Sequence, residues 1–189
     1  MGTELSAAEE ATAVSDAVEI YWRYGLGGTT TRTLERELDL RGKSVHDVFG
    51  TKKALRNRAV TDYLGQVDEL LLQPIERPGS TTTDLKNFVD IHVGLISDQL
   101  HPGCLLVNLV TEAGTTDSFL SSAADAFRKR LGSSVAAVVA KLDADLAAQR
   151  SSQFVTAFFG ICTVARSGAD TDELLEIAAA TKAQISTWT

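Results

Sequence analysis

Residues 28–58 constrain the fold more than any other stretch, because polar side chains, turn chemistry and basic charge occur there together. Thr30 is suited to begin a helix, since its hydroxyl can accept a hydrogen bond from a free backbone N–H of the first turn. Leu34 and Leu38 then lie one turn apart on a single face. The pattern predicts a short first helix, followed by a turn over residues 39–42.

A second short helix is predicted over residues 43–49, with Val45, Val48 and Phe49 buried at spacings of three and four. Its outward positions are all polar, namely Lys43, Ser44, His46 and Asp47. A short helix with a polar outer face is typical of one that enters the major groove of DNA. The two helices therefore form a predicted helix-turn-helix.

Charge favours the same interpretation. Residues 28–58 have a net charge of +4, leaving −11 for the rest of a chain whose total is −7. An acidic body repels phosphate while a basic patch attracts it, so a polyanion is expected to bind at this segment. The alternative for charge alone is an ordinary solvated surface. The basic residues are Arg32, Arg36, Arg41, Lys43, Lys52, Lys53, Arg56 and Arg58.

The sequence from Ala17 to Leu55 resembles the N-terminal domain of the tetracycline-repressor (TetR) family of transcriptional regulators. In that family an aromatic–Gly pair precedes a capping Thr, a helix, a turn, a recognition helix that ends in Phe, and a Lys and a Leu that open a long fourth helix. The matching residues are Ala17, Tyr24, Gly25, Thr30, Leu34, Val45, Phe49, Lys52 and Leu55.

The resemblance implies roles for individual residues. Thr30 would cap the second helix and touch phosphate, Lys43 and Ser44 would face the groove, and Lys52 would bind phosphate. The full set assigned to DNA binding is Thr30, Arg41, Lys43, Ser44, His46, Asp47 and Lys52.

Two positions depart from the family pattern within the helices. His46 stands where a phosphate-binding Tyr is usual, and Glu35 where a small Ala lets the helices approach. Glu35 is expected to tilt outward or to pair with Lys43 or Arg41.

Two further acids bear on the turn and the outer face. Asp39 replaces a turn Gly and is expected to tolerate a left-handed conformation there. Asp47 would repel phosphate unless it accepts a hydrogen bond from a cytosine amine.

Composition predicts an all-α protein with two parts, a DNA-binding domain over residues 1–58 and a ligand-binding and dimerisation domain over residues 59–189. The chain has 189 residues, 44% of them hydrophobic, and only three prolines. It has no run of 18 apolar residues and no signal-peptide pattern, so we expect a cytoplasmic location without membrane contact. Its two cysteines, Cys104 and Cys162, are expected to remain thiols.

The body is predicted to consist of helices. A fourth helix runs from Thr51 until Pro74 stops it, and the next extends to Leu100. Residues 104–112 are apolar on nearly every side, which indicates a buried central helix, and residues 117–142 form a long amphipathic one.

Two C-terminal helices, over residues 146–166 and 172–188, are predicted to form a dimer surface. Their apolar positions recur at intervals of three and four, as in a helical seam, and two helices from each subunit would make a four-helix bundle. The alternative is an ordinary core within one chain. The predicted seam residues are Phe154, Phe158, Ile161, Leu174, Ala178, Thr181, Ile185 and Trp188.

An effector site is predicted in the body, because family members bind ligands in a cavity between equivalent helices. A mostly apolar lining with His92 and Asn108 as polar anchors suits a small hydrophobic or aromatic molecule. The alternative is a closed core in which His92 is satisfied. The predicted lining is Phe88, His92, Cys104, Leu106, Asn108, Leu109 and Phe127.

Catalytic chemistry has little support in the sequence. Gly-rich phosphate loops, HExxH and GxSxG are absent, and the three histidines fit no zinc spacing, so no cofactor or metal is predicted. Cys104 follows Pro102-Gly103 at a predicted helix N-terminus, where backbone N–H groups lower a thiol pKa. It is either a sensor of oxidants or electrophiles or a small buried apolar residue.

The sequence therefore predicts a homodimeric repressor that binds palindromic double-stranded operator DNA and is released by a small effector. The alternative is a helical ligand-binding protein of the same fold that has lost DNA recognition. An enzyme ranks third.

Overall fold

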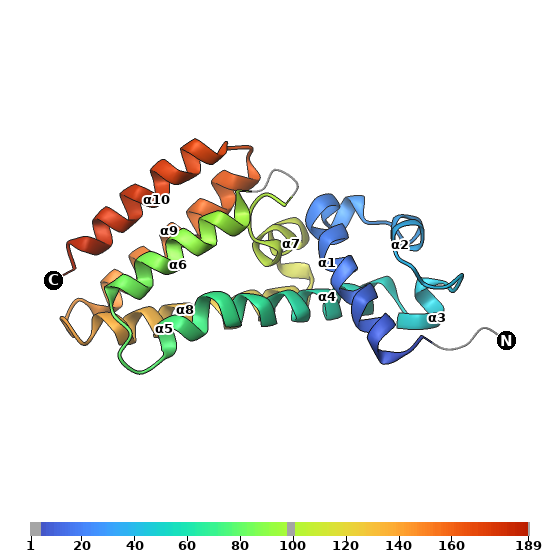
Figure 1. Ribbon diagram of the computed structural model, residues 1–189, viewed down its shortest axis with the longest axis horizontal. Coiled ribbons are helices and arrows are strands. Elements are labelled where there is room, and N and C mark those ends of the chain that lie inside the picture. The colour runs from blue at the N-terminus through green and yellow to red at the C-terminus, as the bar shows by residue number, and fades with distance from the viewer. Residues whose placement is uncertain (1–4, 98–100, 189) are drawn as a thin grey trace.

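The computed structural model describes residues 5–97 and 101–188, and every regular element within these ranges is helical (Figure 1). The predicted all-α fold is confirmed. A π-helical turn, η1 (Asp68–Leu72), and a 3-10 turn, η2 (Gly114–Thr116), interrupt the α-helices. The α-helices are α1 (Ala7–Gly28), α2 (Thr31–Glu37), α3 (Val45–Phe49), α4 (Lys52–Val67), α5 (Gln73–Glu76), α6 (Thr82–Ile96), α7 (Leu105–Ala113), α8 (Ser118–Val139), α9 (Ala147–Arg166) and α10 (Thr171–Ser186).

The molecule is elongated, with α1, α2 and α3 gathered at one end and α6, α9 and α10 at the other (Figure 1). Helix α4 begins beneath the first group and runs along the base of the molecule into the body, and α7 lies between the two ends. Leu55, Val60 and Tyr63 of α4 are buried along this path. One helix therefore connects the two ends, as predicted.

Pro74 does not stop the helix that α4 begins. The helical path continues through η1 and α5 to Glu76, and Pro74 lies in the first turn of α5. A residue in that turn has no obligatory hydrogen bond from its own nitrogen, so the missing N–H of proline is tolerated. The change of hydrogen-bond spacing in η1 provides this new start.

The central helix is buried as predicted. Leu105, Leu106 and Leu109 of α7 are at most 1% exposed. Helix α6 ends at Ile96, and the predicted end at Leu100 lies outside the described residues. Helix α8 ends at Val139 rather than at the predicted residue 142. No helix within residues 5–97 and 101–188 has both the length and the apolar character needed to cross a membrane.

Candidate functional site

The helix-turn-helix begins with the predicted cap. Thr30 Oγ1 accepts a hydrogen bond from the backbone N–H of Thr33 at 3.0 Å, and the two threonine hydroxyls are 2.9 Å apart. Leu34 and Leu38 are buried beneath α2. The polar start and the apolar face of α2 therefore lie where the sequence indicated.

Helix α3 begins at Val45 rather than at residue 43, because Ser44 is its N-cap. Ser44 Oγ accepts from the Asp47 N–H at 3.1 Å, and Asp47 Oδ2 accepts from the Ser44 N–H at 3.0 Å. This reciprocal pair is a capping box. Lys43 and Ser44 thus precede the helix, and the prediction that they lie on its outer face is wrong.

The same geometry gives Asp47 a structural role. Its carboxylate also accepts a hydrogen bond from the Ser44 hydroxyl at 2.7 Å, and the hydrogen bonds from Ser44 hold the pKa of Asp47 below its usual value. The carboxylate is therefore ionised and committed to the start of α3. His46 is exposed beside it.

Glu35 joins the two helices of the motif. Its Oε1 accepts a hydrogen bond from the first backbone N–H of α3, that of Val45, at 3.1 Å. The predicted ion pair with Lys43 or Arg41 is wrong, because the unpaired amides at a helix start are strong donors to a carboxylate. An acid at this position therefore fastens α3 to α2.

The turn of the motif is left-handed, but at different residues from the one predicted. Arg41 has φ +53° and Gly42 has φ +77°, whereas Asp39 does not have a positive φ. Asp39 Oδ1 instead accepts from the Arg41 N–H at 3.2 Å, the hydrogen bond of an Asx turn. Asp39 therefore stabilises the turn through its side-chain carboxylate rather than through its own backbone conformation.

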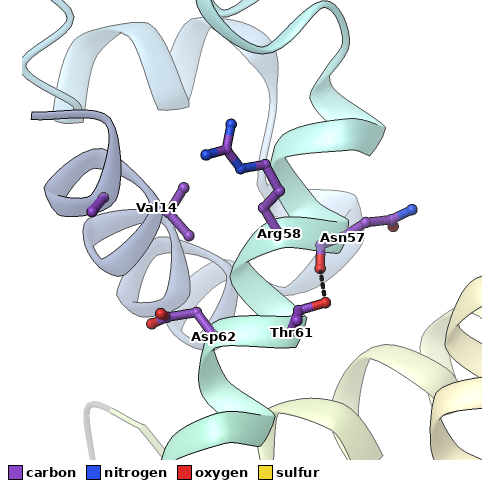
Figure 2. A pocket seen from close by; sticks show the side chains of 6 residues that line it. Val14, Asn57, Arg58, Thr61 and Asp62 are labelled. Carbon is purple, nitrogen blue, oxygen red and sulfur yellow. Dashed lines mark hydrogen bonds between the residues drawn. The ribbon is translucent and has the colours of Figure 1, made fainter. Parts of the chain in front are cut away.

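Acids of α1 neutralise part of the predicted basic patch. The Arg41 guanidinium lies 2.7 Å from Glu9, and Arg58 pairs with Glu10. Arg58 also borders a wide, open hollow between α1 and α4, in which the Thr61 hydroxyl donates to a carbonyl of its own helix (Figure 2). The hollow is too open to enclose a ligand.

Other basic residues remain available to phosphate. Lys52 Nζ donates to the backbone carbonyl of Thr29 at 2.7 Å, which holds the ammonium close to the start of α2. Within the described residues, Arg32 and Lys43 have no carboxylate within 4.0 Å. The open positive charge therefore lies around the start of α2 and the loop before α3.

A cavity of about 50 Å³ lies in the body, lined by residues of α1, α4, η1, α6 and α9 and by Cys104, the N-cap of α7. Leu70 and Leu95 at its edge are 47% and 38% exposed, whereas Cys104 within it is 3% exposed. The cavity thus reaches from the surface to a buried thiol. Its lining comprises Trp22, Tyr63, Gln66, Val67, Leu70, Leu71, His92, Leu95, Ile96, Cys104 and Phe158.

Only part of the predicted effector lining contacts this space. His92 and Cys104 do, and Phe88 lines a small neighbouring hollow that also includes His92. Asn108 donates to the Pro102 carbonyl at 2.9 Å, so its amide holds the loop before α7 and is no ligand anchor. Leu106, Leu109 and Phe127 are buried in the core and line neither of these two spaces.

Each of the two cysteines has a polar partner among the residues that line the cavity. The Tyr63 hydroxyl donates to Cys104 Sγ at 3.3 Å, and Cys162 Sγ lies 3.4 Å from His92 Nε2. The His92 ring stacks on Phe158 with centroids 4.4 Å apart. Burial lowers the pKa of His92 to about 3, so this imidazole is neutral.

Both ends of α7 are hydrogen-bonded to α1. At the N-terminal end, Trp22 Nε1 donates to the Gly103 carbonyl at 2.8 Å. At the C-terminal end, Glu112 Oε2 accepts from the Leu26 N–H at 2.8 Å, where Gly25 with φ +66° breaks α1. A Cβ on Gly25 would lie 2.2 Å from the Glu112 carboxylate, so this contact requires glycine.

The predicted dimer seam packs within one chain instead. Seven of its eight side chains are at most 5% exposed, and Thr181 is half-buried. The excess apolar width of α9 is used against α6 and α8, for example by Phe154 and Phe158, whose rings contact Phe88. The buried residues are Phe154, Phe158, Ile161, Leu174, Ala178, Ile185 and Trp188.

The sequence interpretation missed Trp22, Tyr63, Cys162 and Glu112 as site residues. Trp22 and Tyr63 fit the apolar stripes of their helices, and their polar atoms gave no separate signal. No spacing in the sequence pairs residue 162 with residue 104.

Comparison with known sequences gives a partial match. No family model matches the chain. YezE of Bacillus subtilis (strain 168), an uncharacterized HTH-type transcriptional regulator, is 27% identical over 105 residues. The match covers 55% of this chain and 54% of that protein, so it extends over about half the length of the curated relative.

Solved structures match almost the whole chain. The TetR-family regulator CifR, in a cysteine-substituted variant complexed with 26-base-pair double-strand operator DNA, superposes with a TM-score of 0.78 and 20% identity over 96% of this chain and 97% of that one. A TetR regulator from Chloroflexus aurantiacus J-10-FL gives a TM-score of 0.80 and 16% identity over 95% and 94%. The chain has the TetR-family fold. The resemblance inferred from residues 17–55 is thus confirmed, and the TetR fold extends through α10.

Proposed function

We propose that this TetR-fold protein is a homodimeric transcriptional repressor that binds palindromic operator DNA and is released by an effector in the body. The helix-turn-helix carries the proposal. Glu35 fixes α3 against α2 and the Ser44–Asp47 capping box holds the start of α3, while His46 on its outer face stays exposed. A short, rigidly held helix with a polar exposed face suits insertion into a major groove.

The DNA contacts follow from the charges that remain open. Arg32, Lys43 and Lys52 flank the start of α2 and the loop before α3, where they are suited to contact phosphates on both sides of the groove. Thr30 adds the helix start of α2, whose backbone N–H groups attract a phosphate. In a two-fold dimer, two copies of α3 would enter grooves about 34 Å apart.

We assign the dimer interface to the outer faces of α9 and α10. These faces expose mostly small side chains, which let helices from two subunits approach closely, and one large apolar residue, Leu175. Exposed residues on these faces include Thr156, Gly160, Thr163, Leu175, Ala179 and Ala183. A four-helix bundle then forms from this side of the two helices, rather than from the predicted seam.

Effector control is proposed to act through α7. Trp22 lines the cavity and is hydrogen-bonded to Gly103, and Glu112 at the other end of α7 holds the break in α1. A molecule that prefers a displaced α7 therefore also displaces α1 and shifts the population of DNA-binding states. A hydrophobic or aromatic effector suits the apolar walls but has to widen the cavity.

A second candidate function is ligand binding without DNA recognition. The ion pairs of Arg41 with Glu9 and of Arg58 with Glu10 favour it, because they withdraw two positive charges from phosphate. DNA binding measured by fluorescence anisotropy separates the two functions.

The test uses DNA from upstream of the protein's own gene. Wild type should bind one near-palindromic site tightly, and Lys43→Ala should weaken binding to that site and to random DNA alike without changing the preferred sequence, because a phosphate contact carries no base information. Lys129→Ala is the matched control, because Lys129 lies on the exposed face of α8 and pairs with Asp125 on the same helix. The proposal would be contradicted if wild type binds the upstream site no more tightly than random DNA and Lys43→Ala binds it as tightly as wild type does.

A further inference from the structure

The backbone next to Cys104 approaches the backbone of Cys162 closely. Gly103 has φ +75°, and a Cβ at this position would lie 2.8 Å from the backbone carbonyl oxygen of Cys162. Only glycine permits this approach. It places the adjacent Cys104 against the part of α9 that carries Cys162, and these are the only two cysteines of the chain.

The two thiols differ in acidity. The thiol of Cys162, followed by the Tyr63 hydroxyl and backbone N–H groups of α7, lowers the pKa of Cys104 to about 7 against the opposing effect of burial. Burial raises the pKa of the Cys162 thiol well above its usual value. Cys104 is therefore the nucleophile, and Cys162 is a protonated partner beside the neutral His92.

We propose that Cys104 and Cys162 form a dithiol site that hydrogen peroxide oxidises to an intrachain disulfide, and that this disulfide weakens DNA binding. The chemical part, disulfide formation within one chain, does not depend on the proposed function. The regulatory part, the loss of DNA binding, rests on the proposed function and names a peroxide as the class of effector.

The size of the cavity selects the oxidant. A space of about 50 Å³ exceeds the roughly 10–15 Å³ that one water requires, but it is well below the roughly 150 Å³ that holds a benzene ring. Hydrogen peroxide therefore fits beside Cys104, whereas an aromatic electrophile requires the walls to move. The half-exposed Leu70 and Leu95 mark the side from which peroxide enters.

The reaction has two steps. The Cys104 thiolate attacks one peroxide oxygen, so that an S–O bond forms, the O–O bond breaks, and the departing hydroxide takes up a proton to leave as water. The Cys162 sulfur then attacks the sulfenic sulfur of Cys104, an S–S bond forms, and the S–O bond breaks. The sulfenic oxygen leaves as a second water with the Cys162 proton, and the two thiols have lost two electrons to the peroxide.

Disulfide formation has a structural consequence for α7. The two sulfurs must approach to about 2.05 Å, which draws the N-terminal end of α7 toward α9. That end is hydrogen-bonded to Trp22 through Gly103, and the other end of α7 holds α1 through Glu112. The shift is therefore transmitted to the helix that supports α2 and α3.

The chemical test measures the intact mass of reduced full-length protein after exposure to hydrogen peroxide. Wild type should lose the mass of two hydrogens, recover it with dithiothreitol, and yield a Cys104–Cys162 peptide within one chain. Cys162→Ala should instead gain one oxygen, trapped by dimedone at Cys104, and Cys104→Ala should not react. Tyr63→Phe, which keeps the ring, should react about fivefold more slowly, the change expected from one ordinary hydrogen bond.

Thermal melting shows which variants fold, and the wild-type result decides the proposal even where a variant does not. A disulfide between two chains, thiols unchanged in folded wild type, or equal reaction of Cys104→Ala would overturn the dithiol site. In the DNA assay, oxidised wild type should bind at least tenfold more weakly and recover after reduction. A disulfide without a change in affinity overturns the regulatory part, whereas reduced protein that binds no DNA overturns the proposed function and leaves the dithiol result standing.

Discussion

The two ends of the molecule are stabilised by different interactions. In the helix-turn-helix, polar side chains such as Thr30, Ser44 and Glu35 hold the backbone amides at helix starts. The body relies on buried apolar packing, and its polar centre of Cys104, Cys162, Tyr63 and His92 carries no formal charge when both thiols are protonated. Changes in the motif should therefore act mainly on DNA binding, whereas changes in the body should act on stability or response.

The largest effect is expected from a charge placed in the body core. Ile185 is 1% exposed, so Ile185→Asp buries a carboxylate without a partner and should cost several kcal/mol, enough to unfold much of the protein. Leu175 on the same helix is 53% exposed, and Leu175→Asp should leave the melting temperature nearly unchanged while separating the dimer. Thermal melting checks that both variants are compared as intended, and sedimentation measures the dimer. The assignment of the dimer interface would be contradicted if Leu175→Asp stays dimeric at micromolar concentration.

A moderate effect is expected from filling space in the body. Leu109 is fully buried outside the cavity, so Leu109→Trp should overpack the core and cost about 1–3 kcal/mol. Leu95 lies at the cavity edge and is 38% exposed, so Leu95→Trp should preserve stability and slow peroxide oxidation of Cys104. If the Leu109→Trp protein is stable and its oxidation is blocked, the space that admits peroxide lies next to Leu109 rather than at Leu95.

A smaller effect on stability, with a specific effect on DNA, is expected from a cap in the motif. Ser44→Ala removes the capping box of α3 and should cost about 1 kcal/mol while weakening operator binding. Thr81→Ala removes the equivalent capping box of α6 and is the matched control, with a similar cost and unchanged operator affinity. Equal DNA affinities for both variants would show that α3 does not dock on DNA.

The smallest effect on stability is expected from pH near neutrality, which should instead govern the rate of oxidation. The thiolate is the reactive form, so the rate should rise as pH rises through about 7, the pKa of Cys104, and then level off. The titratable groups facing this thiol are Tyr63 from α4 and Cys162 from α9, with His92 from α6 behind Cys162. Initial rates followed by thiol titration test this, and a rate still rising steeply above pH 8 would indicate an ordinary thiol.

The helix-turn-helix was predictable because its signals are local. Thr30 lies three residues before the amide that it caps, as predicted. The Ser44–Asp47 box has the same spacing but was missed, because both residues were assigned to the outer face of the second helix. The roles of Glu35 and Arg41 were not predictable, because they depend on how α2 and α3 approach each other and on which residue takes the left-handed turn.

The candidate site in the body was predictable only in part. The stripes on α9 and α10 correctly indicated extensive packing, but a stripe does not specify whether its partner belongs to the same chain or to a second subunit. Cys104 was singled out from its position at a helix start. Its neighbours Tyr63 and Cys162 come from other helices, and their meeting depends on the glycine contact at residue 103.

Operator affinity as a function of salt tests the central claim most directly. Reduced wild-type dimer should bind its operator with an affinity that falls linearly on a log–log plot against salt, because Arg32, Lys43 and Lys52 from two subunits displace counterions from phosphates. Lys52→Ala should flatten the slope by about one unit for each phosphate that the variant no longer neutralises, without changing the preferred sequence. An affinity that does not depend on salt, or equal affinity for operator and random DNA, would contradict the account.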